Sequence, residues 1–269
     1  MGGASVTELD SRKCGNCAAH VPEGHHYCGQ CGAHSADGGE APEHQTLLFG
    51  PMMAPGRAKL ILIRGSDDTF PGASWHLNAT HHHAGRRRGV ILFPDDPTLS
   101  PRQCDFHYED NKLHLSDDAS LNGTFVRVRG EVELQSGDRF TVGQQTLRFE
   151  QLTVGQEFPM QDGTLMYVSP PRPYLFRVVQ ILPDGKEGKV YASPNNEVSM
   201  GREGCDLNFP EDRNTSRRHA AVIHEGDRFI LRDFDSSNGT FLAVRAKHAL
   251  VHGDYVFIGK QLLRVEITE

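Results

Sequence analysis

Three short segments near the C-terminal end of the chain combine side chains that bind oxyanions. They are Gly201-Arg202, Ser216-Arg217-Arg218-His219 and Ser236-Ser237-Asn238-Gly239-Thr240. Guanidinium groups, hydroxyls and amide donors together match the acceptor oxygens of a phosphate group. Neither paired carboxylates, nor a Ser-His-Asp order, nor a glycine-rich phosphate loop accompanies them. The three segments therefore predict a site that holds a phosphate and does not transfer it.

A second chemical cluster lies near the N-terminus, where two Cys-x-x-Cys pairs supply Cys14, Cys17, Cys28 and Cys31. Two such pairs can complete a tetrahedral zinc shell, and the segment resembles a small zinc ribbon. It has little apolar surface to bury, so metal ligation would have to supply its folding free energy, roughly 10–16 kcal/mol in comparable peptides. We predict one structural Zn²⁺ with no coordination position open for catalysis. Redox-active or disulfide-paired cysteines are the alternative.

The composition sets limits on the fold class and on the partners. The 269 residues include 28 Gly and 15 Pro, which suits turn-rich β structure better than helix bundles. A net charge of −7 gives no overall reason to expect nucleic-acid binding. The N-terminus lacks the features of a signal peptide, and no apolar run is long enough to span a membrane. We expect a cytoplasmic protein without a membrane partner.

The elements that must position these residues are short strands. Apolar runs separated by Gly, Asp and Asn recur from Arg57 onward and predict antiparallel sandwiches or barrels. The pattern returns after 116 residues: Gly85-Arg86 falls on Gly201-Arg202, Ser100 on Ser216, and Asn122-Gly123 on Asn238-Gly239. A constant offset over roughly ninety residues indicates a duplicated domain. We predict two globular domains side by side.

These observations divide the chain into six parts. We predict a flexible N-terminus (1–13), a zinc ribbon (14–34), a linker (35–56), a first repeat (57–150), a second linker (151–172) and a second repeat (173–269). The two linkers are assigned from their Gly, Pro and acidic residues and from the consecutive prolines Pro170-Pro171.

The motif spacing of the second repeat resembles the forkhead-associated (FHA) domain, a phosphothreonine-recognition module. The resemblance implies a mainly β fold, an eleven-strand β-sandwich whose loops at one end bind a phosphopeptide. Carried over residue by residue, it implies peptide contacts from Arg202, Asn214, Ser216, Arg217, Ser237 and Asn238. It assigns structural support of the binding loops to Gly201, His219 and Gly239. Arg218 has no contact assigned by the family, so we interpret it as a surface charge.

The first repeat departs from this pattern. Arg86, Ser100, Arg102 and Asn122 remain, but Pro101, Gln103 and Leu121 stand where the second repeat has Arg217, His219 and Ser237. We predict that the first repeat has lost phosphothreonine recognition and serves as a scaffold or another protein-binding surface.

Two smaller features carry weaker signals. His81-His82-His83 precedes Gly85, and neighbouring side chains of a strand point to opposite faces, so we expect exposed histidines and no shared metal site. Cys104 and Cys205 stand apart from other ligands and are expected to be small buried hydrophobic residues.

The leading functional hypothesis is a non-enzymatic adaptor in Ser/Thr kinase signalling. Its second repeat would bind a phosphothreonine protein, either a Ser/Thr kinase or a kinase substrate. The alternative is a regulator that binds nucleic acid or the transcription machinery through its zinc ribbon, with the FHA domains as scaffold. Residues 11–34 offer only Arg12, Lys13 and one aromatic residue, Tyr27, for such contacts. We further hypothesise that a phosphorylated Thr7 could dock into the second repeat of its own chain.

Overall fold

The computed structural model describes residues 12–21, 28, 30, 55–65, 71–152, 174–192 and 195–268. The predicted mainly β fold is confirmed, because the elements of this part of the chain are all strands. It contains no helix long and apolar enough to cross a membrane. Cys31, Thr7 and most of the three segments predicted as flexible or linking (1–13, 35–56 and 151–172) lie outside the described residues.

The chain divides into two compact units, Met1–Leu48 and Phe49–Glu269. In the first unit, β1 (Arg12–Lys13) and β2 (His20–Val21) form an antiparallel pair. A tight turn joins them, in which the Cys14 amide donates to the Ala19 carbonyl at 2.8 Å. Cys14, Val21 and Cys28 form the small buried cluster of this unit.

In the second unit each repeat contributes ten described strands. Those of the first repeat are β3 (Ala58–Arg64), β4 (Ser74–Leu77), β5 (His81–Gly85), β6 (Ile91–Leu92), β7 (Cys104–Glu109), β8 (Lys112–Asp117), β9 (Thr124–Arg127), β10 (Glu131–Leu134), β11 (Arg139–Val142) and β12 (Gln145–Gln151). Those of the second repeat are β13 (Phe176–Ile181), β14 (Glu187–Ala192), β15 (Glu197–Gly201), β16 (Leu207–Asn208), β17 (Ala220–Glu225), β18 (Arg228–Asp233), β19 (Thr240–Ala243), β20 (Lys247–Ala249), β21 (Tyr255–Ile258) and β22 (Gln261–Ile267).

These strands form one ten-stranded sheet and two five-stranded sheets. The ten-stranded sheet has the order β14-β13-β12-β11-β19-β9-β21-β22-β3-β4. The five-stranded sheets have the orders β20-β8-β7-β5-β6 and β10-β18-β17-β15-β16. Each five-stranded sheet shares a hydrophobic core with one half of the long sheet. The result is two β-sandwiches.

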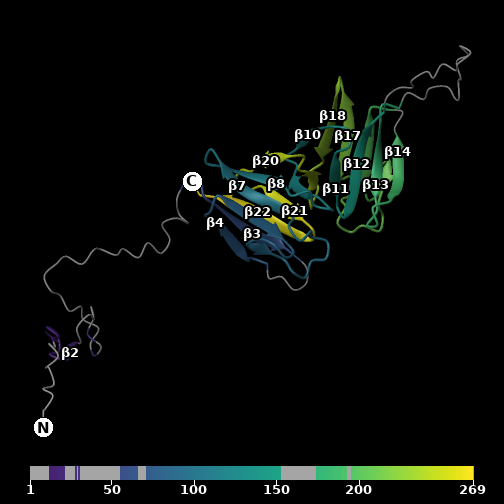
Figure 1. Cartoon of the computed structure of the whole chain (residues 1–269). Coiled ribbons are helices and arrows are strands. Elements are labelled where there is room, and N and C mark those ends of the chain that lie inside the picture. The colour runs from purple at the N-terminus through teal and green to yellow at the C-terminus, as the bar shows by residue number, and fades with distance from the viewer. Residues whose placement is uncertain are drawn as a thin grey trace, which may run out of the picture. The chain divides into compact units, whose positions relative to one another are not determined.

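Neither sandwich is made from one repeat alone. The first core combines Leu60 and Phe106 of the first repeat with Val256 and Leu263 of the second. The second core combines Phe140 and Phe149 of the first repeat with residues of the second. In Figure 1 the yellow strands β21 and β22 accordingly lie beside the blue strand β3, and the teal strands β11 and β12 lie beside the green β13. The structure therefore differs from two self-contained domains: the repeats exchange β10–β12 for β20–β22.

The exchange is symmetric about the pair β9–β19 in the middle of the long sheet. Val126 faces Leu242 across this pair, and these two positions are related by the same 116-residue offset as the repeats. The chain changes sandwich directly afterwards. Val126 packs in the first core and Val128 in the second, whereas Leu242 packs against the second core and Val244 against the first. The chain thus crosses from one sandwich to the other at two places, once between Val126 and Val128 and once between Leu242 and Val244.

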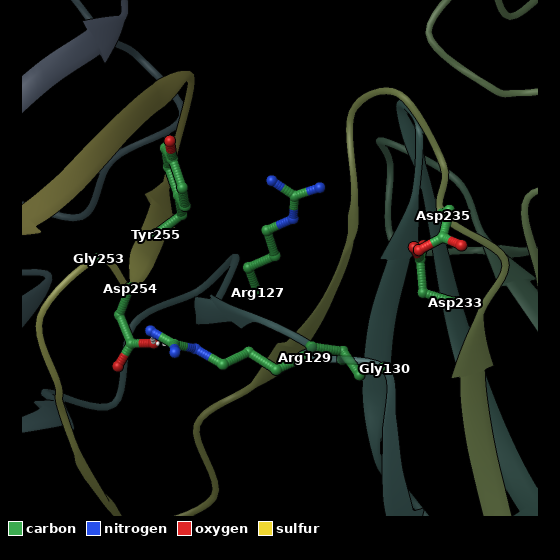
Figure 2. A pocket seen from close by; sticks show the side chains of 9 residues that line it. Arg127, Arg129, Gly130, Asp233, Asp235, Gly253, Asp254 and Tyr255 are labelled. Atoms are coloured by element: carbon green, nitrogen blue, oxygen red, sulfur yellow. Dashed lines mark hydrogen bonds and ion pairs between the residues drawn. The ribbon is translucent and has the colours of Figure 1, made fainter.

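A pair of equivalent ion pairs stabilises the crossovers. Arg129 donates from Nε to Asp254 Oδ1 at 2.9 Å, and Arg245 donates from Nε to Asp138 Oδ1 at 2.8 Å. Figure 2 shows the side chain of Arg129 extending to Asp254. Both carboxylates are largely buried, so each arginine compensates an acid that has lost solvent.

The exchange has a simple physical basis. Leu147 and Leu263, at equivalent positions of the two repeats, are both fully buried, so the burial pattern alone does not assign the final strands to one core. The two sets of strands nevertheless differ in volume: Phe140 and Phe149 of the first repeat stand where the second has Val256 and Val265. The apolar pattern is therefore compatible with both arrangements, while the packing of each core is not the same.

The exchange predicts a specific cross-link. Lys59 of β3 faces Glu266 of β22 in register, so we expect the double variant Lys59→Cys/Glu266→Cys to form an intramolecular disulfide on mild oxidation. In an unexchanged chain Glu266 would instead face Arg177, as its equivalent Glu150 does. The matched control is therefore Arg177→Cys/Glu266→Cys, with peptide mapping by mass spectrometry as the readout. A disulfide in the control pair and none in the first would rule out the exchange.

Candidate functional site

The predicted phosphate-binding segments of the second repeat meet at one end of the second sandwich. Gly201 ends β15, and a Cβ atom at this position would lie 2.1 Å from the carbonyl oxygen of Arg217. Only glycine allows the two loops to approach so closely. The Arg202 amide then donates to the Ser216 carbonyl at 2.9 Å, which joins the first segment to the second.

The loop that precedes Ser216 is organised by the buried carboxylate of Asp212. Its Oδ1 accepts a hydrogen bond from the Asn214 amide at 2.9 Å. Its Oδ2 accepts hydrogen bonds from the Gln144 amide at 2.8 Å and from Gln145 Nε2 at 2.9 Å. Burial raises the pKa of Asp212, but these hydrogen bonds together lower it by more than burial raises it. The pKa of Asp212 therefore lies below its ordinary value. Since Gln144 and Gln145 belong to the first repeat, the exchanged strands brace the binding loop of the second.

His219 connects two of the three segments. Its Nδ1 accepts a hydrogen bond from the Ser216 amide at 3.0 Å, and its Nε2 lies 3.2 Å from the Gly239 carbonyl. This pattern requires the neutral ring with its proton on Nε2. The side chain is completely buried, and burial lowers the pKa of His219 although Gly239 and Asp233 oppose the shift. The predicted supporting residue is thus a neutral bridge between loops.

The third segment is a tight turn held by Asp233. Ser236 Oγ donates to Asp233 Oδ1 at 2.6 Å, and the Gly239 amide donates back to Ser236 Oγ at 3.1 Å. Gly239 has a φ of 80°, a conformation that favours glycine. The Ser237 amide donates to Ser216 Oγ at 3.1 Å, so this turn is also fastened to the second segment.

These loops enclose one pocket, and all six residues predicted to contact a phosphopeptide line it. Arg213 and Thr215 line it as well, which the sequence reasoning missed. The lining consists of Arg202, Arg213, Asn214, Thr215, Ser216, Arg217, Ser237 and Asn238. Three arginines, two serines and two asparagines of this lining carry donor groups, whereas Thr215 is 2% exposed and its Oγ1 donates to the Val142 carbonyl at 3.4 Å. Such a set of donors can bind a doubly charged phosphate from several sides.

The remaining arginine of the motif, Arg218, does not line this pocket. Its guanidinium lies 4.0 Å from the centre of the Phe234 ring and 3.3 Å from Glu197 Oε1. Arg217 lines the pocket, although its Nε contacts Glu203 Oε1 at 2.8 Å. That ion pair is exposed and contributes little, so a phosphate can compete for the guanidinium.

The equivalent loops of the first repeat keep their backbone geometry but lack four of the eight donor side chains, those of Arg213, Thr215, Arg217 and Ser237. The Arg86 amide donates to the Ser100 carbonyl at 3.0 Å, and the Leu121 amide donates to Ser100 Oγ at 3.1 Å, as in the second repeat. Asn122 Nδ2 donates to the Thr98 carbonyl at 2.7 Å. Pro97, however, stands at the position of Arg213, and the Arg102 side chain is held by Asp118 at 2.6 Å.

Gln103 performs the structural task of His219 in the first repeat. Its Oε1 accepts from the Ser100 amide at 2.9 Å, and its Nε2 donates to the Gly123 carbonyl at 2.9 Å. The side chain is completely buried, as that of His219 is. A neutral histidine and a glutamine thus offer the same acceptor and donor to the same loops. Position 219 is therefore part of the scaffold, and this substitution by itself does not make the first repeat degenerate.

A separate pocket lies where the chain crosses between the sandwiches, and Figure 2 shows it. Its lining comes from both repeats: Arg127, Val128, Arg129, Gly130, Asp233, Asp235, Gly253, Asp254 and Tyr255. The Arg127 guanidinium lies 5.6 Å from the centre of the Tyr255 ring. A Cβ atom on Gly239 would lie 2.4 Å from Arg127 Nε, so Arg127 of the first repeat also packs against the binding turn of the second.

The cysteines near the N-terminus approach one another as a metal site requires. Ligand atoms of Cys14, Cys17 and Cys28 all lie within 4.8 Å of one another, and the Cys17 and Cys28 sulfurs are 3.6 Å apart. Three of the four predicted ligands are thus close enough to hold a metal ion. The fourth, Cys31, lies outside the described residues. Of the two remaining cysteines, Cys104 is fully buried as predicted, while Cys205 is partly exposed.

The neutral His219 bridge predicts a pH dependence. A lowered pKa in the folded state means that its stabilisation is complete above the ordinary histidine pKa of about 6.5 and is lost as the pH falls below it. In the wild type, protonation of His219 should lower the free energy of unfolding by up to about 1.4 kcal/mol per pH unit in this range. We expect His219→Gln to lack this part of the decrease, because glutamine cannot take up the proton. Urea unfolding at pH 7.5 and pH 5.5 measures the effect.

Gln103→His is the matched control and should add the same pH dependence to the first sandwich. An equal loss of stability between the two pH values in the wild type and in His219→Gln would contradict the neutral bridge.

Comparison with known proteins agrees with this geometry. A family model described as the FHA domain matches residues 82–143 and 198–259. The chain is 35% identical over 100 residues to the glycogen accumulation regulator GarA of Mycobacterium tuberculosis, covering 36% of this chain and 59% of that protein. It is 34% identical over 96 residues to the oxoglutarate dehydrogenase inhibitor of Corynebacterium efficiens, covering 35% of this chain and 66% of that protein. The chain thus spans about three fifths to two thirds of these relatives.

A solved FHA domain from Chlamydia trachomatis aligns with 78% of this chain and 96% of its own, at 10% identity and a TM-score of 0.32. The two family matches are related by the same 116-residue offset as the repeats. Each begins in the strand that leads to the first binding segment and ends in the turn before the last strand. The chain therefore contains two FHA-domain sequences, one in each repeat.

Proposed function

We propose that this protein is a non-enzymatic adaptor that binds phosphothreonine proteins through the pocket of its second repeat. The observation that carries the proposal is the meeting of Arg202, Arg213 and Arg217 with the Ser216 and Ser237 hydroxyls in one pocket. Asn238, whose Nδ2 donates to the Asn214 carbonyl at 2.9 Å, would fix the peptide backbone next to the phosphothreonine. A phosphothreonine-containing Ser/Thr kinase or a kinase substrate is the partner that fits this role.

The energetics of the pocket are consistent with reversible signalling. A phosphate carries about −1.5 to −2 charges, and each charge-assisted hydrogen bond contributes roughly 1.5–3 kcal/mol. Loss of solvent and ordering of the peptide offset much of this gain. We therefore expect micromolar dissociation constants, which correspond to a binding free energy of about −8 kcal/mol. A cytoplasmic location is part of the same proposal, since the phosphorylated partners would be found there.

The names of the relatives support a regulatory role. One is called a regulator and the other an inhibitor, and neither name describes catalysis by the protein itself. The first repeat, with Pro101 and Leu121 at two positions of the binding motif, is proposed to serve as scaffold. Its exchanged strands brace the binding loop of the second repeat through Gln144 and Gln145.

The central test removes Arg202. We expect Arg202→Ala in the full chain to weaken binding of a phosphothreonine peptide roughly 10- to 150-fold, the equivalent of about 1.5–3 kcal/mol for one charge-assisted hydrogen bond. Isothermal titration with a peptide selected from a phosphothreonine library measures this, and the unphosphorylated peptide is the negative control.

Arg86→Ala, the equivalent change in the first repeat, is the matched control and should leave the affinity unchanged. If Arg86→Ala lost affinity for the phosphopeptide and Arg202→Ala kept it, the binding site would lie in the first repeat. Unchanged affinity in both variants would reject the phosphopeptide pocket.

We propose further that Cys14, Cys17, Cys28 and Cys31 hold one structural Zn²⁺. The closeness of the first three supports it, and thiolates are the ligands that such sites prefer. Nucleic-acid binding through this unit finds little support, because residues 11–34 contain only Arg12 and Lys13 as arginine or lysine residues.

Cys17→Ser should lower the zinc content of the purified chain by one equivalent and increase amide exchange in residues 12–21. The unfolding midpoint of the sandwiches should not change, since they form a separate compact unit. Metal analysis by mass spectrometry provides the measurement, and an unchanged zinc content would contradict the assignment.

A further inference from the structure

A row of histidines covers part of the five-stranded sheet of the first sandwich. His81 of β5 is the register partner of His107 of β7, and His107 is the register partner of His114 of β8. Their rings stack, with centroids 5.5 Å apart for His81 and His107 and 5.8 Å apart for His107 and His114. In the neighbouring row, His83 is the register partner of Asp105.

Strand geometry explains why the sequence did not predict this cluster. Adjacent side chains do point to opposite faces, and His82 is accordingly turned inward, with 6% of its surface exposed. His82 is thus not the exposed histidine that the sequence predicted. His81 and His83 share the outer face, and the partners that complete the cluster come from the next strands.

The nitrogen atoms of this cluster converge on one carboxylate. His81 Nδ1 lies 2.7 Å from Asp105 Oδ2, and His107 Nδ1 lies 3.4 Å from the same oxygen. His83 Nδ1 lies 3.1 Å from the other oxygen, Oδ1. Asp105 is 7% exposed, and neither its Oδ1 nor the Nδ1 atoms of His83 and His107 have a hydrogen bond of acceptable geometry. A buried carboxylate with an unsatisfied oxygen beside three imidazoles is costly unless a further group binds there.

We propose that His81, Asp105 and His107 bind a divalent transition-metal ion of the zinc class. Their ligand atoms lie within 4.8 Å of one another. Tetrahedral zinc with bonds of about 2.0–2.2 Å separates its ligands by roughly 3.3–3.6 Å. The distance between His107 and Asp105 already fits, and His81 must move by about 0.7 Å to reach the same separation. This movement is easy, because the His81 side chain is 60% exposed.

The surroundings supply the second layer of a metal site. His83 Nδ1 lies 3.1 Å from Asp105 Oδ1, so a small rotation would make it the outer partner that metal-ligating carboxylates commonly have. One side of the cluster is open to solvent through His81, so a fourth position remains for water or for a ligand from a partner. We expect exchangeable binding, in contrast to the closed cysteine site.

The second repeat provides an internal control. At the positions of His81, Asp105 and His107 it has Glu197, Ala221 and Ile223. The sandwich therefore forms without these three side chains, and the scaffold does not require them. We attribute their presence in the first repeat to a ligand that binds independently of the pocket in the second repeat.

The test titrates Zn²⁺ into the untagged full chain whose cysteine site is already filled. We expect one additional equivalent to bind in isothermal titration and to raise the unfolding midpoint. Co²⁺ bound there should give d–d absorption without the sulfur-to-metal charge-transfer bands of a cysteine site. His81→Gln and His107→Gln should each abolish the additional equivalent. His81→Gln changes an exposed side chain, so the variant should fold.

His76→Gln removes an exposed histidine of β4 outside the cluster and is the matched control. It should bind the additional equivalent as the wild type does. No additional equivalent in the wild type, undiminished binding in both cluster variants, or loss of binding in the His76 variant would overturn the proposal. Because phosphopeptide binding is measured separately, failure here would leave the proposed function untouched.

Discussion

The pairing of β9 with β19 is the interaction on which the rest of the sandwiches depends. It places Val126 opposite Leu242 and joins ten strands of both repeats into one sheet. Each repeat must then send its last strands into the other core, since the chain changes sandwich within two residues. Every buried side chain of β21 and β22 consequently stabilises the first sandwich, and those of β11 and β12 stabilise the second. The repeats are separate in sequence and interdependent in structure.

This interdependence extends to the loops that line the proposed phosphate pocket. Asp212 orders the loop that carries Ser216, and its carboxylate is satisfied by Gln144 and Gln145 of the other repeat. In the first sandwich Asp96 receives the equivalent hydrogen bonds from the Lys260 amide and from Gln261. A buried carboxylate without such donors would be strongly destabilised. The loop that contains Asp212 and the loop that contains Asp96 are therefore each supported by a turn of the other repeat.

The two repeats have diverged at the surface while keeping the same scaffold. The second keeps the arginines and hydroxyls of the pocket, whereas the first replaces Arg213 and Arg217 with Pro97 and Pro101. The first repeat in turn has the histidine face built on Asp105, where the second has Ala221. Gln103 and His219 show the other side of this divergence: different residues perform the same structural task. Duplication thus leaves the buried hydrogen bonds in place and allows the exposed chemistry to change.

The sequence by itself determined the strand-rich fold, the duplication, the approach of Cys14, Cys17 and Cys28, and six of the eight residues that line the proposed phosphate pocket, because these follow from local patterns and fixed spacing. It could not determine which repeat each final strand joins, since the final strands of both repeats carry the same pattern of buried apolar residues, with Leu147 and Leu263 at equivalent positions. It missed Arg213, which has no motif position, and it missed the face formed by His81, Asp105 and His107, whose members lie on different strands. Only the tertiary structure decided these points, because strand register and exchange bring together residues that are distant in the chain.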